Sequence, residues 1–142
     1  MIKLIDILLK EEEQEKYHIL KQLRSPEDRK KNYIIATQQK IQQYIKDGSK
    51  GDLDLNGTPI TSLPDNLTVK GNLDLNNTPI ISLPDNLTVG GSLSLHDTPI
   101  TSLPDTLKVG GSLDLRNTPL SKTHTVYQIR QMAPGIKGTI FT

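Results

Sequence analysis

Apolar and polar residues follow a fixed pattern through the middle of the chain, and the pattern repeats every twenty residues. Each unit opens on a glycine, at Gly51, Gly71, Gly91 and Gly111. In the first unit Leu53 and Leu55 alternate with polar neighbours, which predicts a short strand with one buried face. A fixed period in the twenties is typical of a solenoid, in which successive units stack as coils.

The rest of each unit predicts an extended return to the next strand. Pro59 and Pro64 lack the N–H group that a helix or an interior strand needs, so this side should contain no helix. A second, shorter strand is expected over 67–69, before the glycines turn the corner. Ordering twenty residues costs at least about 20 kcal/mol of conformational entropy. About six apolar side chains, each contributing roughly 1.5–3 kcal/mol when buried, do not stabilise one unit alone. The units must therefore stack, and the end coils need covers.

The first fifty residues predict a helical hairpin that covers the first coil. Apolar stripes at helical spacing indicate a helix over 1–24, with an interruption. Ser25 and Pro26 are typical of the start of a second helix, and Asp47-Gly48 of its end. An alternative use of this hairpin is a partner site or dimer contact of its own.

The last residues predict a second cap made from a modified repeat. A short helix is expected over 125–132, where apolar residues share one face. Residues 136–142 align with 69–75, which predicts a fifth strand after an enlarged coil of 27 residues (138 − 111 = 27). The predicted organisation is a helical N-terminal cap over 1–50, a solenoid over 51–120, and a C-terminal cap with a final strand over 121–142.

Composition and charge narrow the class of protein. The chain has no cysteine, which excludes disulfides and thiolate sites. Its apolar N-terminal stretch is too short and too interrupted for a signal peptide or a membrane span, so a cytoplasmic protein without a membrane partner is expected. Residues 51–120 carry three Lys and Arg against eight Asp, while the segments on either side are each +3. An acidic solenoid does not have the basic stripe of a nucleic-acid binder, so no nucleic-acid partner is expected.

Strand alternation places a set of polar residues on the outward side of the predicted sheet. We predict that they bind a protein: Asp54, Asn56, Asp74, Asn76, Ser94, His96, Asp114 and Arg116. Asp54 should stack on Asp74 at strand spacing, an arrangement that a basic or hydrogen-bond-rich partner would stabilise. A metal is not expected, because no cage of further ligands is visible, and no cofactor is expected either.

Little in the sequence indicates catalysis. His96, Asp97 and Arg116 lie close in the repeat pattern, but no Ser/His/Asp set, phosphate loop or zinc spacing is present. We therefore predict no catalytic residues. A small-ligand binder or hydrolase that uses these three residues remains an alternative.

The repeats resemble two groups of known proteins. The Leu-Pro-Asp-Asn-Leu units behind a basic helical hairpin are similar to the short leucine-rich repeats of secreted effectors from Gram-negative pathogens. Val-Gly-Gly-Ser-Leu-Asp-Leu-x-Asn-Thr-Pro is similar to small repeat proteins of bacteriophages and prophages. Thr58 and its repeats stand where the leucine-rich-repeat motif usually has Asn. Some effectors add a ubiquitin-ligase domain with a catalytic cysteine, an activity that this cysteine-free chain does not inherit.

The resemblance implies an α/β solenoid of the leucine-rich-repeat type, with a parallel β-sheet, an N-terminal α-helical hairpin cap and a C-terminal helix–strand cap. It implies a non-catalytic protein-binding module that binds and inhibits a host defence or regulatory protein in the host cytoplasm. The alternative is a structural component that assembles from copies of itself. The oligomeric state is left open by the sequence.

Overall fold

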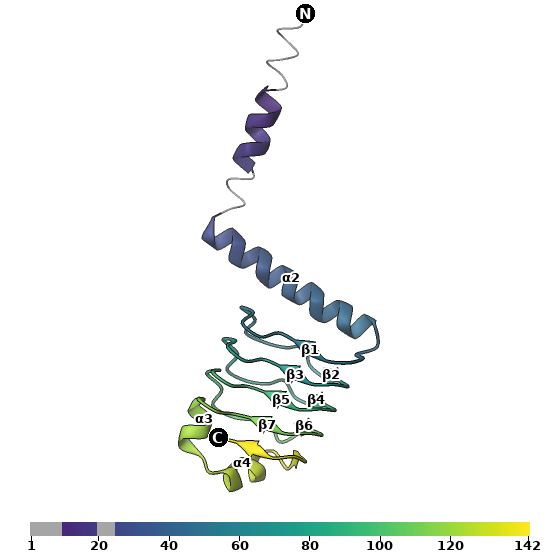
Figure 1. The fold of residues 1–142 in the computed structure, drawn as a ribbon, viewed down its shortest axis with the longest axis vertical. Helices are drawn as coiled ribbons and strands as arrows, with labels where there is room; N and C mark the ends of the chain where they lie inside the picture. The colour runs from purple at the N-terminus through teal and green to yellow at the C-terminus, as the bar shows by residue number, and fades with distance from the viewer. Residues whose placement is uncertain (1–9, 20–24) are drawn as a thin grey trace, which may run out of the picture.

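The protein is described by a computed structural model that covers residues 10–19 and 25–142. Its centre is a stack of coils, with α2 lying across one end and α3 and α4 at the other (Figure 1). Residues 10–19 are helical and exposed, as the sequence predicts for that part of 1–24. The remainder of that prediction, including the turn of the expected hairpin, falls in 1–9 and 20–24, outside the described residues. In the part of the chain that is described, no helix is long and apolar enough to cross a membrane.

Helix α2 (Pro26–Lys46) begins and ends where the sequence indicates. The side chain of Ser25 accepts a hydrogen bond of 3.0 Å from the backbone N–H of Asp28, and Pro26 occupies the first turn, where its missing N–H is harmless. The helix ends at Asp47, and Gly48 follows with a φ of 84°, a conformation that glycine adopts without strain. Local sequence signals alone therefore set both ends of α2.

One face of α2 packs on the first coil. Thr37 and Ile41 are each 3% exposed, and Tyr44 packs beside the same apolar core. The Tyr44 hydroxyl lies 2.8 Å from the carbonyl oxygens of both Ser49 and Gly51, and it donates to this pair. Within the described residues, α2 is the element that covers this end of the solenoid.

The coils are held together by two parallel sheets. The five-stranded sheet has the order β1-β3-β5-β7-β9, and the four-stranded sheet has the order β2-β4-β6-β8. The first comprises β1 (Leu53–Asp54), β3 (Leu73–Asp74), β5 (Leu93–Ser94), β7 (Leu113–Asp114) and β9 (Ile140–Phe141). The second comprises β2 (Thr68–Val69), β4 (Thr88–Val89), β6 (Lys108–Val109) and β8 (Gly135–Ile136). The fold is thus a β-solenoid with flanking helices, and the predicted second strand is confirmed.

The register of the sheets places equivalent residues of successive units above one another. Leu53 pairs with Leu73, and Leu73 pairs with Leu93, so each leucine column forms a continuous interior. The strand leucines and the return-side residues of the core columns, such as Ile60, Leu63 and Leu67, are buried, with exposed fractions of 7% or less, whereas Ile81 on the return side is exposed. The return side is extended and contains no helix in 59–66, 79–86 and 99–106, as the prolines predict.

A threonine at the end of each strand segment is buried with the leucines. Thr58 is 7% exposed, and its hydroxyl donates to the carbonyl of Leu55 at 2.7 Å. Thr78, Thr98 and Thr118 make the equivalent bond within their own coils. The buried hydroxyls are therefore satisfied locally and do not link one coil to the next.

The C-terminal coil keeps the register although its return side is rebuilt. Helix α4 (Val126–Met132) is the predicted short helix, and Leu113 pairs with Ile140, as the alignment of 136–142 with 69–75 predicts. Sequence reasoning missed α3 (Pro119–Thr123). Thr118 caps it in a reciprocal box with Ser121, and the second proline that keeps the other coils extended is missing from this one.

Candidate functional site: the outward side of the five-stranded sheet

The outward side chains of the five-stranded sheet, with the polar residues that flank them, form the surface that we call the strand face. It contains every residue predicted to bind a protein, arranged in columns across the coils. Asp54 pairs with Asp74, and Ser94 pairs with Asp114, so the predicted order of residues is present. The predicted positions are exposed or half-buried throughout.

The first column, beside the predicted residues, links one coil to the next. The carboxylate of Asp52 accepts a hydrogen bond of 2.7 Å from the backbone N–H of Asn72. The side-chain oxygen of Asn72 accepts from the N–H of Ser92 at 2.8 Å, and the Ser92 hydroxyl accepts from the N–H of Ser112 at 3.1 Å. These side chains therefore contribute to the cohesion of the stack.

The second column contains the predicted pair of like charges, and the structure shows how the backbone accommodates it. The carboxylate of Asp54 accepts from the N–H of Asn56 at 3.0 Å, and that of Asp74 accepts from the N–H of Asn76 at 2.9 Å. Each carboxylate thus has a hydrogen-bond donor two residues along its own coil. Both donors lie within the chain, and a basic or hydrogen-bond-rich partner would add to these bonds.

The residues of the predicted catalytic alternative lie in and beside the third column, where His96 pairs with Asp97 and Arg116 pairs with Asp114. His96 Nδ1 lies 3.0 Å from a carboxylate oxygen of Asp97, and Asp97 also accepts from the side-chain amide of Asn117. The guanidinium of Arg116 turns instead to Asp114, with Nη2 at 2.6 Å and Nε at 3.0 Å from the two carboxylate oxygens. Among the described residues, the ion pairs of Arg116 and of His96 are with different carboxylates, so Arg116 does not share a partner with His96 and Asp97.

The pairing of Arg116 with Asp114 fixes the protonation of both groups. The hydrogen bonds from Arg116 hold the pKa of the Asp114 carboxyl below its ordinary value, and the carboxylate raises the pKa of the guanidinium. The Asp114 side chain is only 17% exposed, while that of Arg116 is 62% exposed. At pH 7 both side chains are therefore charged, and the net charge of the pair is zero.

A hollow of about 370 Å³ opens in the strand face next to this pair. It is lined by Ser92, Leu93, Ser94, Ser112, Asp114, Arg116 and Phe141. Phe141 is the outward residue of β9 and is 46% exposed. Sequence reasoning left Phe141 out of the site, although its alignment with Asp74 already places it on the outward side.

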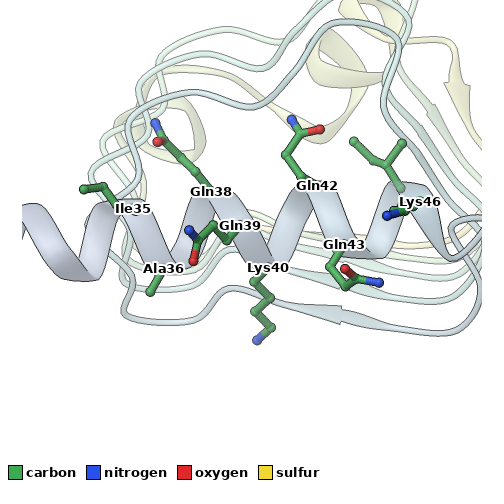
Figure 2. Close-up of a pocket in the computed structure, with 9 residues that line it drawn as sticks. Ile35, Ala36, Gln38, Gln39, Lys40, Gln42, Gln43 and Lys46 are labelled. Carbon is green, nitrogen blue, oxygen red and sulfur yellow. The ribbon is translucent and has the colours of Figure 1, made fainter.

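A second, larger depression runs along α2. Its volume is about 950 Å³, and Figure 2 shows its side chains along the helix with the coils behind. It is lined by Ile35, Ala36, Gln38, Gln39, Lys40, Gln42, Gln43, Ile45 and Lys46. Ile35 is 50% exposed and Ile45 38% exposed, so apolar surface lies open beside amide side chains. This depression lies in the N-terminal region, for which the sequence predicts, as an alternative, a partner site or a dimer contact.

Metal ligands are not clustered in the part of the chain that the structure covers. No group of three or more His, Asp or Glu side chains there is placed to hold an ion. Comparison of the chain with protein-family models, with curated proteins and with solved structures finds no match. The strand face and the surface of α2 therefore have to be interpreted from their own chemistry.

Proposed function

We propose that the chain is a non-catalytic protein-binding module whose strand face contacts the partner. One observation carries the proposal: five strands in register display outward residues that are polar on four strands and aromatic on the fifth, with a hollow of about 370 Å³ at that end. A rigid scaffold holds these side chains in place, because the leucines behind them are buried and the turns are hydrogen-bonded. Preorganised side chains lose little entropy when a partner binds.

The proposed class is a leucine-rich repeat. The period of twenty, the parallel in-register strands and the buried leucine columns support it. The buried Thr58 and its equivalents depart from the usual Asn, and their hydrogen bonds remain within one coil. The links between coils come instead from the backbone and from the column that begins at Asp52.

The charge of the strand face indicates the kind of partner. Asp52, Asp54 and Asp74 lie toward the α2 end, whereas the cationic Arg116 lies at the other end, paired with Asp114. A protein with a basic or hydrogen-bond-rich surface complements this distribution. The similarity of the repeats to phage and effector proteins supports a host protein as the partner, bound in the cytoplasm and inhibited by the contact.

Affinity capture from a bacterial lysate tests the proposal, with the wild-type chain and two triple variants as baits. The first variant replaces Asp74, His96 and Arg116 by alanine. The matched control replaces Asp65, Asp85 and Asp105, which are exposed on the return side. A protein that the wild type and the control retain, and that the first variant loses, is the expected result. Equal retention by all three baits would place the contact elsewhere.

The surface of α2 supports self-assembly as a second candidate function. Ile35 and Ile45 are exposed along the depression of about 950 Å³, where a second copy could bury them. Sedimentation at micromolar concentration separates the candidates. Self-assembly predicts a dimer or larger species that Ile35→Gln with Ile45→Gln dissociates. A wild-type monomer under the same conditions would eliminate it.

A further inference from the structure

The hollow in the strand face lies between two side chains that both recognise flat groups. Phe141 pairs in register with Asp114 and exposes part of its ring. Arg116 extends from the same coil as Asp114, and its guanidinium is held by two hydrogen bonds to that carboxylate. An aromatic ring stacks favourably both on a phenyl ring and on a guanidinium plane. The hollow therefore has a ring on one part of its lining and a planar cation on another.

The lining of the hollow combines polar and apolar surface and carries no net charge. Serine hydroxyls provide hydrogen-bond donors and acceptors, and the charge of Asp114 is balanced by Arg116. A lone cation or anion would gain little from this pair. An aromatic side chain with a polar tip matches it better, because the ring can stack while the tip bonds to a hydroxyl. A volume of about 370 Å³ accommodates one such side chain.

Beyond the hollow, toward α2, the strand face becomes acidic. Asp74 lies one strand from Ser94, and Asp54 lies two strands away. With strands about 4.8 Å apart, these carboxylates are about 5–10 Å from the edge of the hollow. An extended peptide covers that span in two to three residues.

We propose that the hollow receives a tyrosine or tryptophan side chain of the partner protein, and that basic residues two to four positions away in the partner contact Asp74 and Asp54. This inference rests on the proposed function and specifies the chemistry of the partner. Buried aromatic anchors dominate the binding energy of many interfaces, so this contact should determine affinity, while the acidic column sets orientation.

The test is a titration of the ¹⁵N-labelled chain, followed by amide chemical shifts, with acetyl-Tyr-Gly-Lys-Gly-Lys-amide as the probe. Saturable shifts at Ser94, Ser112 and Phe141, and at Asp74, are expected. A matched peptide with Ala in place of Tyr should leave the hollow unshifted. A peptide with Glu in place of both Lys should bind at least about tenfold more weakly, because opposite charges guide the contact.

Two variants of the protein locate the probe, and one serves as a control. Phe141→Ala removes the exposed ring, and Ser94→Leu adds a bulky, uncharged side chain to the lining of the hollow. Both should weaken binding at least about tenfold, as expected for an anchor residue. Ile81→Ala removes an exposed apolar side chain from the return side and should change nothing.

Each outcome decides the inference. No shift at the hollow with millimolar Tyr peptide, equal shifts with the Ala peptide, or unchanged binding by Phe141→Ala and Ser94→Leu overturns the aromatic site. If the lysines still shift Asp54 and Asp74 in that case, the strand face survives as a surface for basic proteins. The broader proposed function fails separately, when a purified partner binds the Asp74, His96 and Arg116 triple variant as well as the wild type.

Discussion

The two sides of the five-stranded sheet are formed by the same strands. From one strand to the next, the inward residues hardly change, whereas the outward residues differ in charge and size. On the inward side, Leu53, Leu73, Leu93, Leu113 and Ile140 are between 0% and 6% exposed. On the outward side, the neighbouring positions are Asp54, Asp74, Ser94, Asp114 and Phe141. Close packing tolerates little change in the volume of an interior residue, whereas an outward position has no such constraint. Variation on a fixed scaffold is what recognition of a partner requires.

The largest expected effect comes from a substitution on the inward side. Leu93→Ala should lower the free energy of unfolding by about 2–5 kcal/mol, since the coils on either side cannot close the cavity fully. Ser94→Ala, one residue further on, should change it by no more than about 0.5 kcal/mol. Urea denaturation of both variants measures the contrast, and similar losses for the two would remove the distinction between the sides.

The second-largest effect is expected at Gly110, where the backbones of two successive coils lie very close to each other. At Gly110 an added Cβ would lie 2.2 Å from the carbonyl oxygen of Gly90, so Gly110→Ala must push two coils apart. A loss of about 1–3 kcal/mol in unfolding free energy is expected. Lys70, at the same place in an earlier unit, already has a side chain, and Lys70→Ala should be nearly neutral. Thermal unfolding of the Gly110→Ala and Lys70→Ala variants measures the difference. An unchanged stability of Gly110→Ala would show that the coils are packed less closely than the distance at Gly110 indicates.

A smaller effect is expected where α2 closes the interior. Tyr44→Phe removes the hydroxyl that serves the carbonyls of Ser49 and Gly51, at a cost of about 1 kcal/mol. Tyr33→Phe, on an exposed tyrosine, is the control.

Tyr44 also makes the stability depend on pH. Burial raises the pKa of Tyr44, so the neutral form stabilises the fold. That contribution is complete below pH of about 10 and is lost as the pH rises through the higher folded value. Denaturation at pH 8 and pH 11 should show a steeper decline for the wild type than for Tyr44→Phe.

The smallest effect lies on the outward side and should leave the fold unchanged. Arg116→Gln removes the cation beside Asp114, so the pKa of Asp114 should rise toward its ordinary value. In the wild type, the stabilisation from this lowered pKa is present above pH of about 4 and is lost as the pH falls through the folded value. Carboxyl ¹³C shifts over a pH titration measure the change, with Lys108→Gln as a control on the other sheet. An unchanged Asp114 curve would mean that the pair does not form in solution.

The inward side could be predicted almost entirely from the sequence, because it depends on periodicity alone. Glycine spacing set the register of Leu53 on Leu73, and the alignment of 136–142 predicted the pairing of Leu113 with Ile140. The helix α3 was missed because its start depends on a side-chain box between Thr118 and Ser121, which the repeat pattern conceals.

The outward side could be predicted in position but not in geometry. Alternation places Asp54 and Asp74 outward, yet it does not show that each carboxylate turns back to an N–H of its own coil. Nor does it show that Arg116 selects Asp114 over Asp97, since that depends on the side-chain rotamer. The hollow beside Phe141 arises from volumes on three strands and emerges only when they are stacked.

Calorimetric titration tests most directly whether the strand face is the binding surface. A purified partner is titrated into the wild-type chain and into two triple variants. We expect the variant with alanine at Asp74, His96 and Arg116 to bind at least about tenfold more weakly than the wild type, a loss of about 1.4 kcal/mol or more. The variant with alanine at Asp65, Asp85 and Asp105 should bind like the wild type, and all three should remain folded at the temperature of the titration, which their melting curves check. Equal affinity of the first variant and the wild type would contradict the assignment of the strand face as the binding surface.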